Sequence, residues 1–439
     1  MIKSRLEKLK KFINFYNLDG YIIPKNDAYF SEFSIPDRLK TISNFTGSAG
    51  QAIVLKNENF LFVDGRYTLQ AELESGKYYK IFEMPKFSKK KIFDKYKKKL
   101  KLGYDPQLFT SFLLKKTLKK YFRLISINDN LVDRIHKVTE QNLVTPFYNL
   151  SSKITGESIK SKINRVVTKL NELKIDNIFI SAPENVAWLL NLRGGDNPNS
   201  PIPNCKIFLT KNQKIYFFSC PKKIFKMKKI SEYKKINFYT YQDLFKVVKN
   251  LKGKNFCIDK NTCSIFNEKN IRLFFKIKST TDPCYEIKSR KNNLEIKNMI
   301  NAHIEDGAAL TKFLYWIKKI NKKKISEFYA QNKLEKFRKK SKNYLYPSFN
   351  TIAGSGDNGA IVHYRATKKK TKTINKKDIF LCDSGGQYKY GTTDVTRTVC
   401  FSKPDKKIKD IFTKVLRGHI AVACTNINTH KTGKSIDMR

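Results

Sequence analysis

The sequence predicts a mixed α/β chain in which one small module occurs twice, ahead of a third region with a different pattern. Three observations predict this. A helical stripe, a short strand and a hairpin follow one another near the amino terminus, and the same succession returns after about residue 150. A long amphipathic helix then opens the third region. The 439 residues, 40% of them hydrophobic, give room for about three domains with packed cores.

The first module begins with a helix, because apolar residues recur every three or four positions over 6–16. The apolar run 21–24 follows a polar stop and predicts a buried strand. Residues 52–55 and 60–63 are apolar and flank a polar turn, which predicts a hairpin. A further helix is expected over 68–74.

The second module repeats this order. An apolar stripe at helical spacing covers 163–173, and a strand is expected over 178–180. The run C-K-I-F-L-T-K-N-Q-K-I-Y-F-F-S, from Cys205, echoes Q-A-I-V-L-K-N-E-N-F-L-F-V-D, from Gln51. Two copies of one α/β module, with a boundary near residues 145–154, are the simplest explanation. A repeated fold by itself implies no function.

The third region opens near Asp282 with a long helix. Its apolar face runs from Ile296 to Ile317 at spacings of three, four and seven, and it includes His303. Helical periodicity already explains that histidine as a core or helix-packing residue, in preference to a ligand. A second helix is expected over 325–338.

Two strands and a glycine-rich loop follow these helices. Residues 348–353 and 360–364 favour strands, and 354–359 form the loop between them. The second strand carries His363. A lone histidine in a strand is usually structural, so this pattern alone assigns His363 no catalytic role.

Two aspartates, Asp383 and Asp394, interrupt an apolar and β-branched stretch. Residues 379–382 and 395–401 favour strands, and the glycines between them favour turns and bulges, so a hairpin would bring the aspartates together. Two carboxylates in a buried strand pair repel each other and lose hydration, so they need cations or a shared proton. A dimetal site would supply the cations, since hard divalent ions prefer oxygen ligands. Alternatively, both aspartates cap turns beside Gly and Thr.

Composition bears on compartment and partners. The formal net charge is +50, but the lysines are spread along the whole chain, and basic charge without a recognition motif does not support a nucleic-acid role. The amino terminus does not resemble a signal peptide, and no run of about 18 apolar residues could span a membrane. The eight cysteines lack C-x-x-C spacing, which is typical of reduced thiols and predicts a cytoplasmic setting.

Several motifs resemble one family. D-S-G-G-Q-Y, from Asp383, and G-T-T-D-V-T-R-T, from Gly391, are similar to the metal-binding hairpin of the Xaa-Pro aminopeptidase (aminopeptidase P) metallopeptidases. R-L-K-T-I-S-N-F-T-G-S-A-G and W-L-L-N-L-R-G-G-D resemble that family's two amino-terminal domains, and A-H-I-E-D-G-A-A-L resembles the start of its catalytic domain. The resemblance implies two related creatinase-like α/β domains, residues 1–147 and 148–285, followed by an incomplete pita-bread metallopeptidase domain, residues 286–439.

The resemblance also implies an activity and a site. Asp383 and Asp394 would be the first two of five ligands to two divalent ions, with Mn²⁺ the expected metal. His363, in N-G-A-I-V-H-Y, would contact the substrate and stabilise the tetrahedral intermediate, a task that suits an imidazole. The implied reaction is release of the N-terminal residue from peptides with proline at the second position, by a hydroxide that the two ions activate.

The family's remaining ligands, a histidine and two glutamates, find no match. After Phe401 the histidines are His419, in a helical segment, and His430, in a turn-like segment. We therefore expect a C-terminally truncated chain with negligible activity of its own, and a homodimer for the full-length protein. Two alternatives stay open: a non-catalytic pita-bread protein that binds nucleic acid or protein, and a creatinase-type hydrolase.

Overall fold

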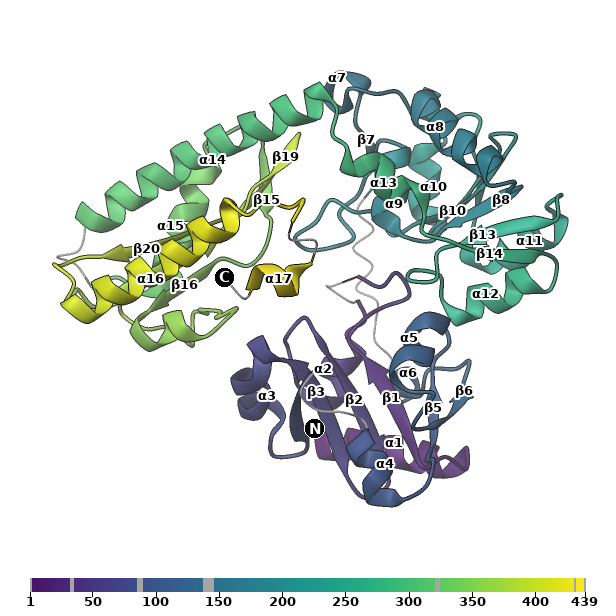
Figure 1. The fold of residues 1–439 in the computed structure, drawn as a ribbon, viewed down its shortest axis with the longest axis horizontal. Helices are drawn as coiled ribbons and strands as arrows, with labels where there is room; N and C mark the ends of the chain where they lie inside the picture. Colours follow the sequence, from purple (N-terminus) through teal and green to yellow (C-terminus); the bar gives the residue numbers. More distant parts are fainter. Residues whose placement is uncertain are drawn as a thin grey trace. The chain divides into compact units, whose positions relative to one another are not determined.

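The chain forms two compact units. The computed structural model describes residues 2–31, 35–84, 90–136, 146–319, 324–429 and 432–437. The first unit comprises Met1–Asp306, Ser341–Phe349 and Gly386–Thr393, and the second comprises Gly307–Lys340, Asn350–Gly385 and Asp394–Arg439. The long helix α14 (Asn293–Lys319) begins in the first unit and ends in the second (Figure 1).

The first unit opens with a six-stranded sheet in the order β4-β3-β2-β1-β5-β6. The strands are β1 (Gly20–Pro24), β2 (Gly50–Leu55), β3 (Asn59–Asp64), β4 (Lys80–Met84), β5 (Lys101–Tyr104) and β6 (Arg123–Ser126). β1, β2 and β3 pair antiparallel in succession, whereas β4, β5 and β6 add in parallel. The accompanying helices are α1 (Ile2–Phe15), α2 (Arg38–Ser43), α3 (Thr68–Ser75), α4 (Lys90–Tyr96), α5 (Ser111–Thr117) and α6 (Leu131–Ile135). The predicted helix, strand and hairpin of the first module are confirmed.

A second six-stranded sheet repeats this topology in the order β12-β11-β10-β8-β13-β14. The strands are β8 (Asn177–Ile180), β10 (Lys206–Thr210), β11 (Ile215–Phe218), β12 (Asn237–Tyr239), β13 (Asn255–Ile258) and β14 (Lys276–Ser279). Each pair has the direction of its counterpart in the first sheet. The helices are α7 (Ser152–Thr155), α8 (Ile159–Glu172), α9 (Pro183–Leu189), α10 (Pro221–Met227), α11 (Leu244–Asn250), α12 (Ile265–Arg272) and α13 (Pro283–Ser289). The same strand order in both sheets confirms the predicted duplication.

Apolar helix faces close the cores of both modules. On α1 the buried residues lie three or four positions apart, and they are Ile2, Leu6, Leu9 and Ile13. On α8 the buried apolar residues also share one face, at positions i, i+3, i+4 and i+7, and they are Ile163, Val166, Val167 and Leu170. Burying each such side chain contributes about 1.5–3 kcal/mol, so these stripes hold the helices on the sheets. Residues 137–145, just ahead of the first predicted domain boundary, lie outside the described residues.

Two three-stranded sheets follow along the chain. One, in the first unit, has the order β15-β18-β19, with β15 (Tyr344–Pro347), β18 (Gly386–Tyr388) and β19 (Gly391–Thr392). The other, in the second unit, has the order β16-β17-β20, with β16 (Ile352–Ser355), β17 (Ile379–Ser384) and β20 (Val395–Cys400). The predicted pairing of the two strands around the aspartates is confirmed. The residues between them form more than a turn, because β18 and β19 make a hairpin that pairs with β15.

Three sequence predictions in this region are wrong. The first strand is shorter than expected and begins at Ile352. Residues 360–364 are not a strand, since Ala360 ends the short 3-10 helix η4 (Gly356–Ala360) and a bend and a turn follow at 361–363. His303 is exposed instead of buried, and its Nδ1 lies 2.9 Å from the Met299 carbonyl oxygen.

The error at His303 has a simple geometric cause. The face of α14 that packs is formed by Ala302, Ala309, Leu310, Phe313 and Ile317. The apolar residues of the first half of the predicted stripe are exposed, namely Ile296, Met299 and Ile300. The apolar pattern shows which residues could pack, whereas the neighbouring elements decide which of them do.

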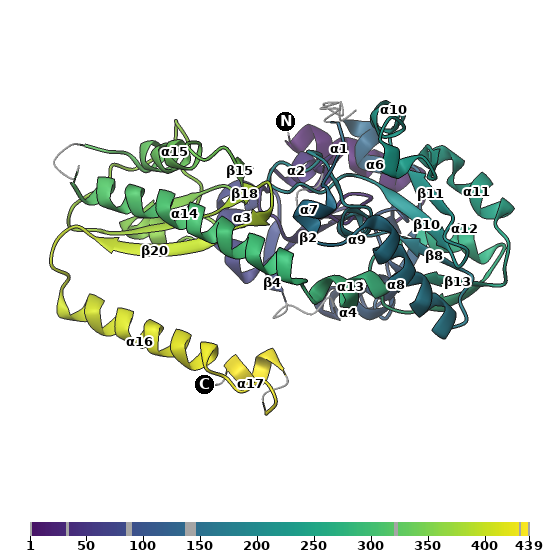
Figure 2. The same cartoon turned by 90° about the horizontal axis from the view of Figure 1, so that it is seen from above.

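The last described helices carry no buried residue. They are α16 (Lys406–Ala423), which contains His419, and α17 (Gly433–Asp437). α16 stands apart from β20 and from α15 (Glu327–Arg338) of the same unit (Figure 2). His430 lies outside the described residues. Among the helices of the described ranges, none combines the length and the apolarity needed to cross a bilayer.

Candidate metal centre

Asp383 lies in the central strand of the sheet in the second unit. Along β17 burial alternates, so that Phe380 and Cys382 are fully buried while Asp383 is partly exposed. Successive side chains of a strand point to opposite faces. Phe380 and Cys382 belong to the core with Leu310 of α14 and Leu334 of α15, so Asp383 faces away from these helices.

Asp394 lies just before the first residue of the neighbouring strand. In the β17–β20 register Asp383 is opposite Thr396, and Ser384 is opposite Val395. Asp394 and Thr396 are two positions apart, so both share the face of the sheet that Asp383 occupies. Asp383 and Asp394 are therefore diagonal neighbours on one face, a relation that places Cα atoms about 7–8 Å apart. Asp394 itself is exposed.

The other two residues that the sequence predicts for the site, Asp394 and His363, both act electrostatically on Asp383. Partial burial raises the pKa of the Asp383 carboxyl, and the negative charge of Asp394 raises it further. The Thr396 hydroxyl, 2.7 Å from Asp383 Oδ1, and the nearby imidazole of His363 act in the opposite direction. The structure thus brings Asp383, Asp394 and His363 within electrostatic reach of one another.

His363 sits on an exposed turn rather than in a strand. Its φ of 59° lies in the left-handed region, which is uncommon for a residue other than glycine. Such conformations persist only where the surroundings fix them, and they cluster at functional sites. The turn lies close enough to Asp383 for the His363 imidazole to act on that carboxyl electrostatically.

The two carboxylates have the oxygen donors that suit a hard divalent cation. Oxygen donors match Mg²⁺ and Mn²⁺, and a cation would relieve the repulsion that raises the pKa of Asp383. Across the described ranges, no three His, Cys, Asp or Glu side chains converge in a way that could hold a metal. Burial raises the pKa of the neighbouring Cys382 thiol to about 12, so it stays protonated on the other face of the strand. The alternative of a turn cap does not apply to Asp383, which lies within β17.

Two further residues, which were not predicted from the sequence, support this strand. Thr396 could have been found from the register, because it lies opposite Asp383. Arg338, at the end of α15, is 1% exposed, and its Nη2 donates a 3.0 Å hydrogen bond to Ser384 Oγ. A charged residue at the end of a polar helix gives no sequence signal for such burial.

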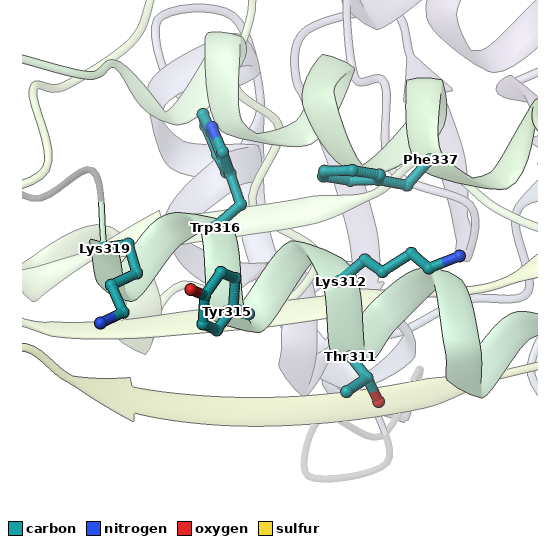
Figure 3. A pocket seen from close by; sticks show the side chains of 6 residues that line it. All are labelled: Thr311, Lys312, Tyr315, Trp316, Lys319 and Phe337. Carbon is teal, nitrogen blue, oxygen red and sulfur yellow. The ribbon is translucent and has the colours of Figure 1, made fainter.

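A hollow in the second unit lies apart from this site, since none of its lining residues is Asp383, Asp394 or His363. It has a volume of about 750 Å³ and lies between α14 and α15 (Figure 3). Its lining residues are Thr311, Lys312, Tyr315, Trp316, Lys319 and Phe337. None of them is acidic, so the hollow offers no ligand for a divalent cation.

The chain matches known families along most of its length. Residues 5–135 and 140–295 each match the family model of the creatinase/prolidase N-terminal domain, and residues 297–438 match metallopeptidase family M24. Xaa-Pro aminopeptidase 1 of Dictyostelium discoideum is 32% identical over 463 residues, which cover 99% of this chain and 73% of that protein. Xaa-Pro aminopeptidase ApepP of Drosophila melanogaster is 31% identical over 444 residues, which cover 96% of this chain and 71% of that protein.

A solved structure with a similar fold is also an X-prolyl aminopeptidase. The X-prolyl aminopeptidase of Caenorhabditis elegans, described as a cytosolic enzyme with a di-nuclear active site, superposes with a TM-score of 0.89 and 27% identity. The match covers 96% of this chain and 74% of that one. The repeated amino-terminal sheets match the two creatinase-type domains of these relatives, and the region that carries Asp383 and Asp394 matches their metallopeptidase domain. The chain belongs to the Xaa-Pro aminopeptidase family, with creatinase-type N-terminal domains and an M24 metallopeptidase domain.

Proposed function

We propose that this chain provides the amino-terminal domains and the first metal ligands of an aminopeptidase that releases the N-terminal residue from peptides with proline second. The observation that carries the proposal is the placement of Asp383, in β17, and Asp394, just before β20, on one face of the strand pair, with His363 nearby. The names of the relatives support the substrate class.

Each of the three residues has a proposed role. Asp383 and Asp394 hold divalent ions through carboxylate oxygens, and Mn²⁺ fits these donors. Such ions supply an activated water at neutral pH for attack on a peptide carbonyl. His363 faces the substrate and donates a hydrogen bond to the oxygen on which negative charge develops. Its exposure on a turn leaves the imidazole accessible to a peptide.

By itself, the 439-residue chain is proposed to bind metal weakly and to have negligible peptidase activity. Within the described ranges, no three His, Cys, Asp or Glu side chains form a group that could hold a metal ion, so the proposed ligands of this chain are the two carboxylates of Asp383 and Asp394. Affinity for a hard cation rises with the number of charged ligands, so a pair should hold it loosely.

The domain division and the compartment are further parts of this proposal. Residues 1–147, 148–285 and 286–439 would form the two related domains and the partial catalytic domain, a division supported by one six-stranded sheet in each of the first two segments. A cytoplasmic location is supported by the eight free cysteines and by the cytosolic relative from Caenorhabditis elegans.

The test is a peptidase assay on the product of the complete reading frame, with an Arg-Pro-Pro peptide, with and without Mn²⁺. The proposal predicts metal-dependent release of arginine that Asp383→Asn abolishes. Salt-sensitive binding of DNA or RNA by a product without peptidase activity would favour the non-catalytic alternative instead. Hydrolysis that persists without metal would favour the creatinase-type alternative.

A further inference from the structure

A fully buried glutamate lies at the first position of α15. Glu327 is 0% exposed, and the preceding residue, Ser326, caps the helix by accepting a hydrogen bond from the Tyr329 amide. Burying a carboxylate is costly unless hydrogen-bond donors surround it. The donors around Glu327 therefore show which part of the chain this residue organises.

Among the described residues, the donors to the Glu327 carboxylate come from one stretch, residues 355–372. The Ser355 amide donates to Oε1 at 2.8 Å, and the Lys372 amide donates to Oε2 at 2.8 Å. The Asn358 side-chain amide lies 2.9 Å from Oε1, and the Tyr364 hydroxyl donates to Oε2 at 2.9 Å. One acid thus fixes the end of β16, the helix η4 and the turn beyond it.

His363 lies inside this stretch, between two of the donors. Asn358 comes five residues before it, and Tyr364 follows it directly. The Asn358 amide nitrogen also lies 2.9 Å from the Tyr364 hydroxyl, so the two donors bridge the turn as well as contacting Glu327. The turn is closed further by the Tyr364 amide, which donates to the Ile361 carbonyl at 3.1 Å.

The Tyr364 hydroxyl stays protonated and can therefore donate its hydrogen bond to Glu327. Burial, together with the hydrogen bond to Glu327, raises the pKa of Tyr364 to about 12. The hydroxyl therefore keeps its proton at working pH. The Tyr364 ring is 6% exposed and belongs to a small core with Ile352 and Ala366, so the ring is held as well as the hydroxyl.

We infer that Glu327 is the positioning residue for His363: through Asn358 and Tyr364 it holds the left-handed turn that keeps the imidazole near Asp383. The inference rests on the proposed function only in the role that it gives to His363. Glu327 itself does not contact the reacting atoms, because its carboxylate is enclosed by the four donors. Its effect is transmitted through the backbone of the turn.

Glu327→Gln tests this inference in the 439-residue chain. A glutamine presents one acceptor oxygen and one donor amide, so two donors of the stretch would face another donor. The chain has five histidines, which give five imidazole Cε1–H signals in a ¹H–¹³C spectrum, and His363→Gln identifies that of His363. We expect Glu327→Gln to shift or split the His363 signal and to leave the signals of His136, His303 and His419 in place.

Glu335→Gln is the matched control. It removes the same charge from the same helix, where Glu335 lies 3.6 Å from Lys339 in an ion pair one turn apart. This variant should leave the His363 signal unmoved. If Glu327→Gln fails to fold, Tyr364→Phe replaces it as the test variant, because it removes only one of the four donors. Tyr364→Phe should also shift the His363 signal. An unchanged His363 signal in folded Glu327→Gln, or in Tyr364→Phe, overturns the inference.

A kinetic readout separates this inference from the proposed function. In the active product of the complete reading frame, Glu327→Gln should lower kcat about 10–100-fold, the usual range for a residue that orients a functional group. KM should stay unchanged, since the substrate contacts remain. An inactive wild-type product contradicts the proposed function, while the NMR comparison still decides the positioning. A shifted His363 signal with unchanged kcat overturns the catalytic part of the inference.

Discussion

The hydroxyl of Thr396 donates a 2.7 Å hydrogen bond to Asp383 Oδ1 from directly across the β17–β20 pair. This bond stabilises the charged form of a carboxyl whose pKa is raised by burial and by Asp394. Thr396 thus keeps Asp383 available as an anion where a cation would need it.

Thr396→Val keeps the shape of the side chain and removes its donor. The pKa of Asp383 should rise further, and because metal binds the deprotonated carboxylate, Mn²⁺ uptake should require a higher pH. A bond of about 0.5–1.5 kcal/mol corresponds to a midpoint shift of about 0.4–1 pH unit. The measurement is Mn²⁺ uptake as a function of pH. Thr396→Ser, which retains the hydroxyl, should behave as wild type, and equal midpoints in all three proteins would show that the bond has no such role.

His363→Asn tests the role of the imidazole. In the active product of the complete reading frame, kcat should fall about 100–1000-fold, the range for loss of a donor to a developing oxyanion. Steady-state kinetics on an Xaa-Pro peptide would measure it. His303→Asn is the control, because that exposed histidine contacts only its own helix in the hydrogen bonds of the described residues. A rise in KM with unchanged kcat would assign His363 to substrate binding alone.

Glu58 makes part of the stability of the first module depend on pH. Burial would raise the pKa of this carboxyl, but hydrogen bonds from Lys80, Lys95 and Tyr96 outweigh it and hold the pKa at about 2. A depressed folded-state pKa gives stability that is present above the ordinary value near 4.5 and is lost as the pH falls toward 2.

Glu58→Gln should therefore cost about 1–2 kcal/mol at pH 7, a value reduced for solvent screening of the exposed lysines. Urea unfolding of both proteins at pH 7, 5 and 3 would measure it, and the difference should shrink between about pH 4.5 and pH 2. Glu72→Gln is the control, since this glutamate lies on the exposed surface of α3. A difference that stays constant down to pH 3 would contradict the assignment.

Phe208 is the central side chain of one core in the second module. It is 0% exposed, and its ring centroid lies 4.9–5.4 Å from those of Phe179, Phe218 and Phe256. Phe208→Ala should destabilise the module by about 3–5 kcal/mol through lost burial and the cavity left behind. Phe225→Ala, at a position that is 64% exposed, should cost far less. Thermal unfolding compares the two, and similar losses would contradict this description of the core.

The strand pair around the metal ligands could be predicted because its pattern is local. Strand propensity on either side of Asp383 and Asp394 fixes the two strands, and alternation then sets which residues share a face. The duplicated module could be predicted for the same reason, since helix, strand and hairpin each leave a short-range pattern.

The turn that carries His363 could not be predicted, because long-range contacts determine it. Residues 360–364 are apolar enough to favour a strand, yet Glu327, more than thirty residues earlier, binds Asn358 and Tyr364 and holds a turn. A glutamate at the start of a helix is normally expected to be exposed, where its negative charge interacts favourably with the helix dipole. Its burial depends on partners that no local pattern reveals.

Titration of the 439-residue chain with Mn²⁺, followed by the loss of the free-ion EPR signal, tests the metal assignment most directly. We predict weak, saturable uptake of Mn²⁺ that Asp383→Asn and Asp394→Asn each abolish. Asp410→Asn, at an exposed position of α16, should leave that uptake intact. Equal uptake by the wild type and by both site variants would contradict the assignment of Asp383 and Asp394 as metal ligands.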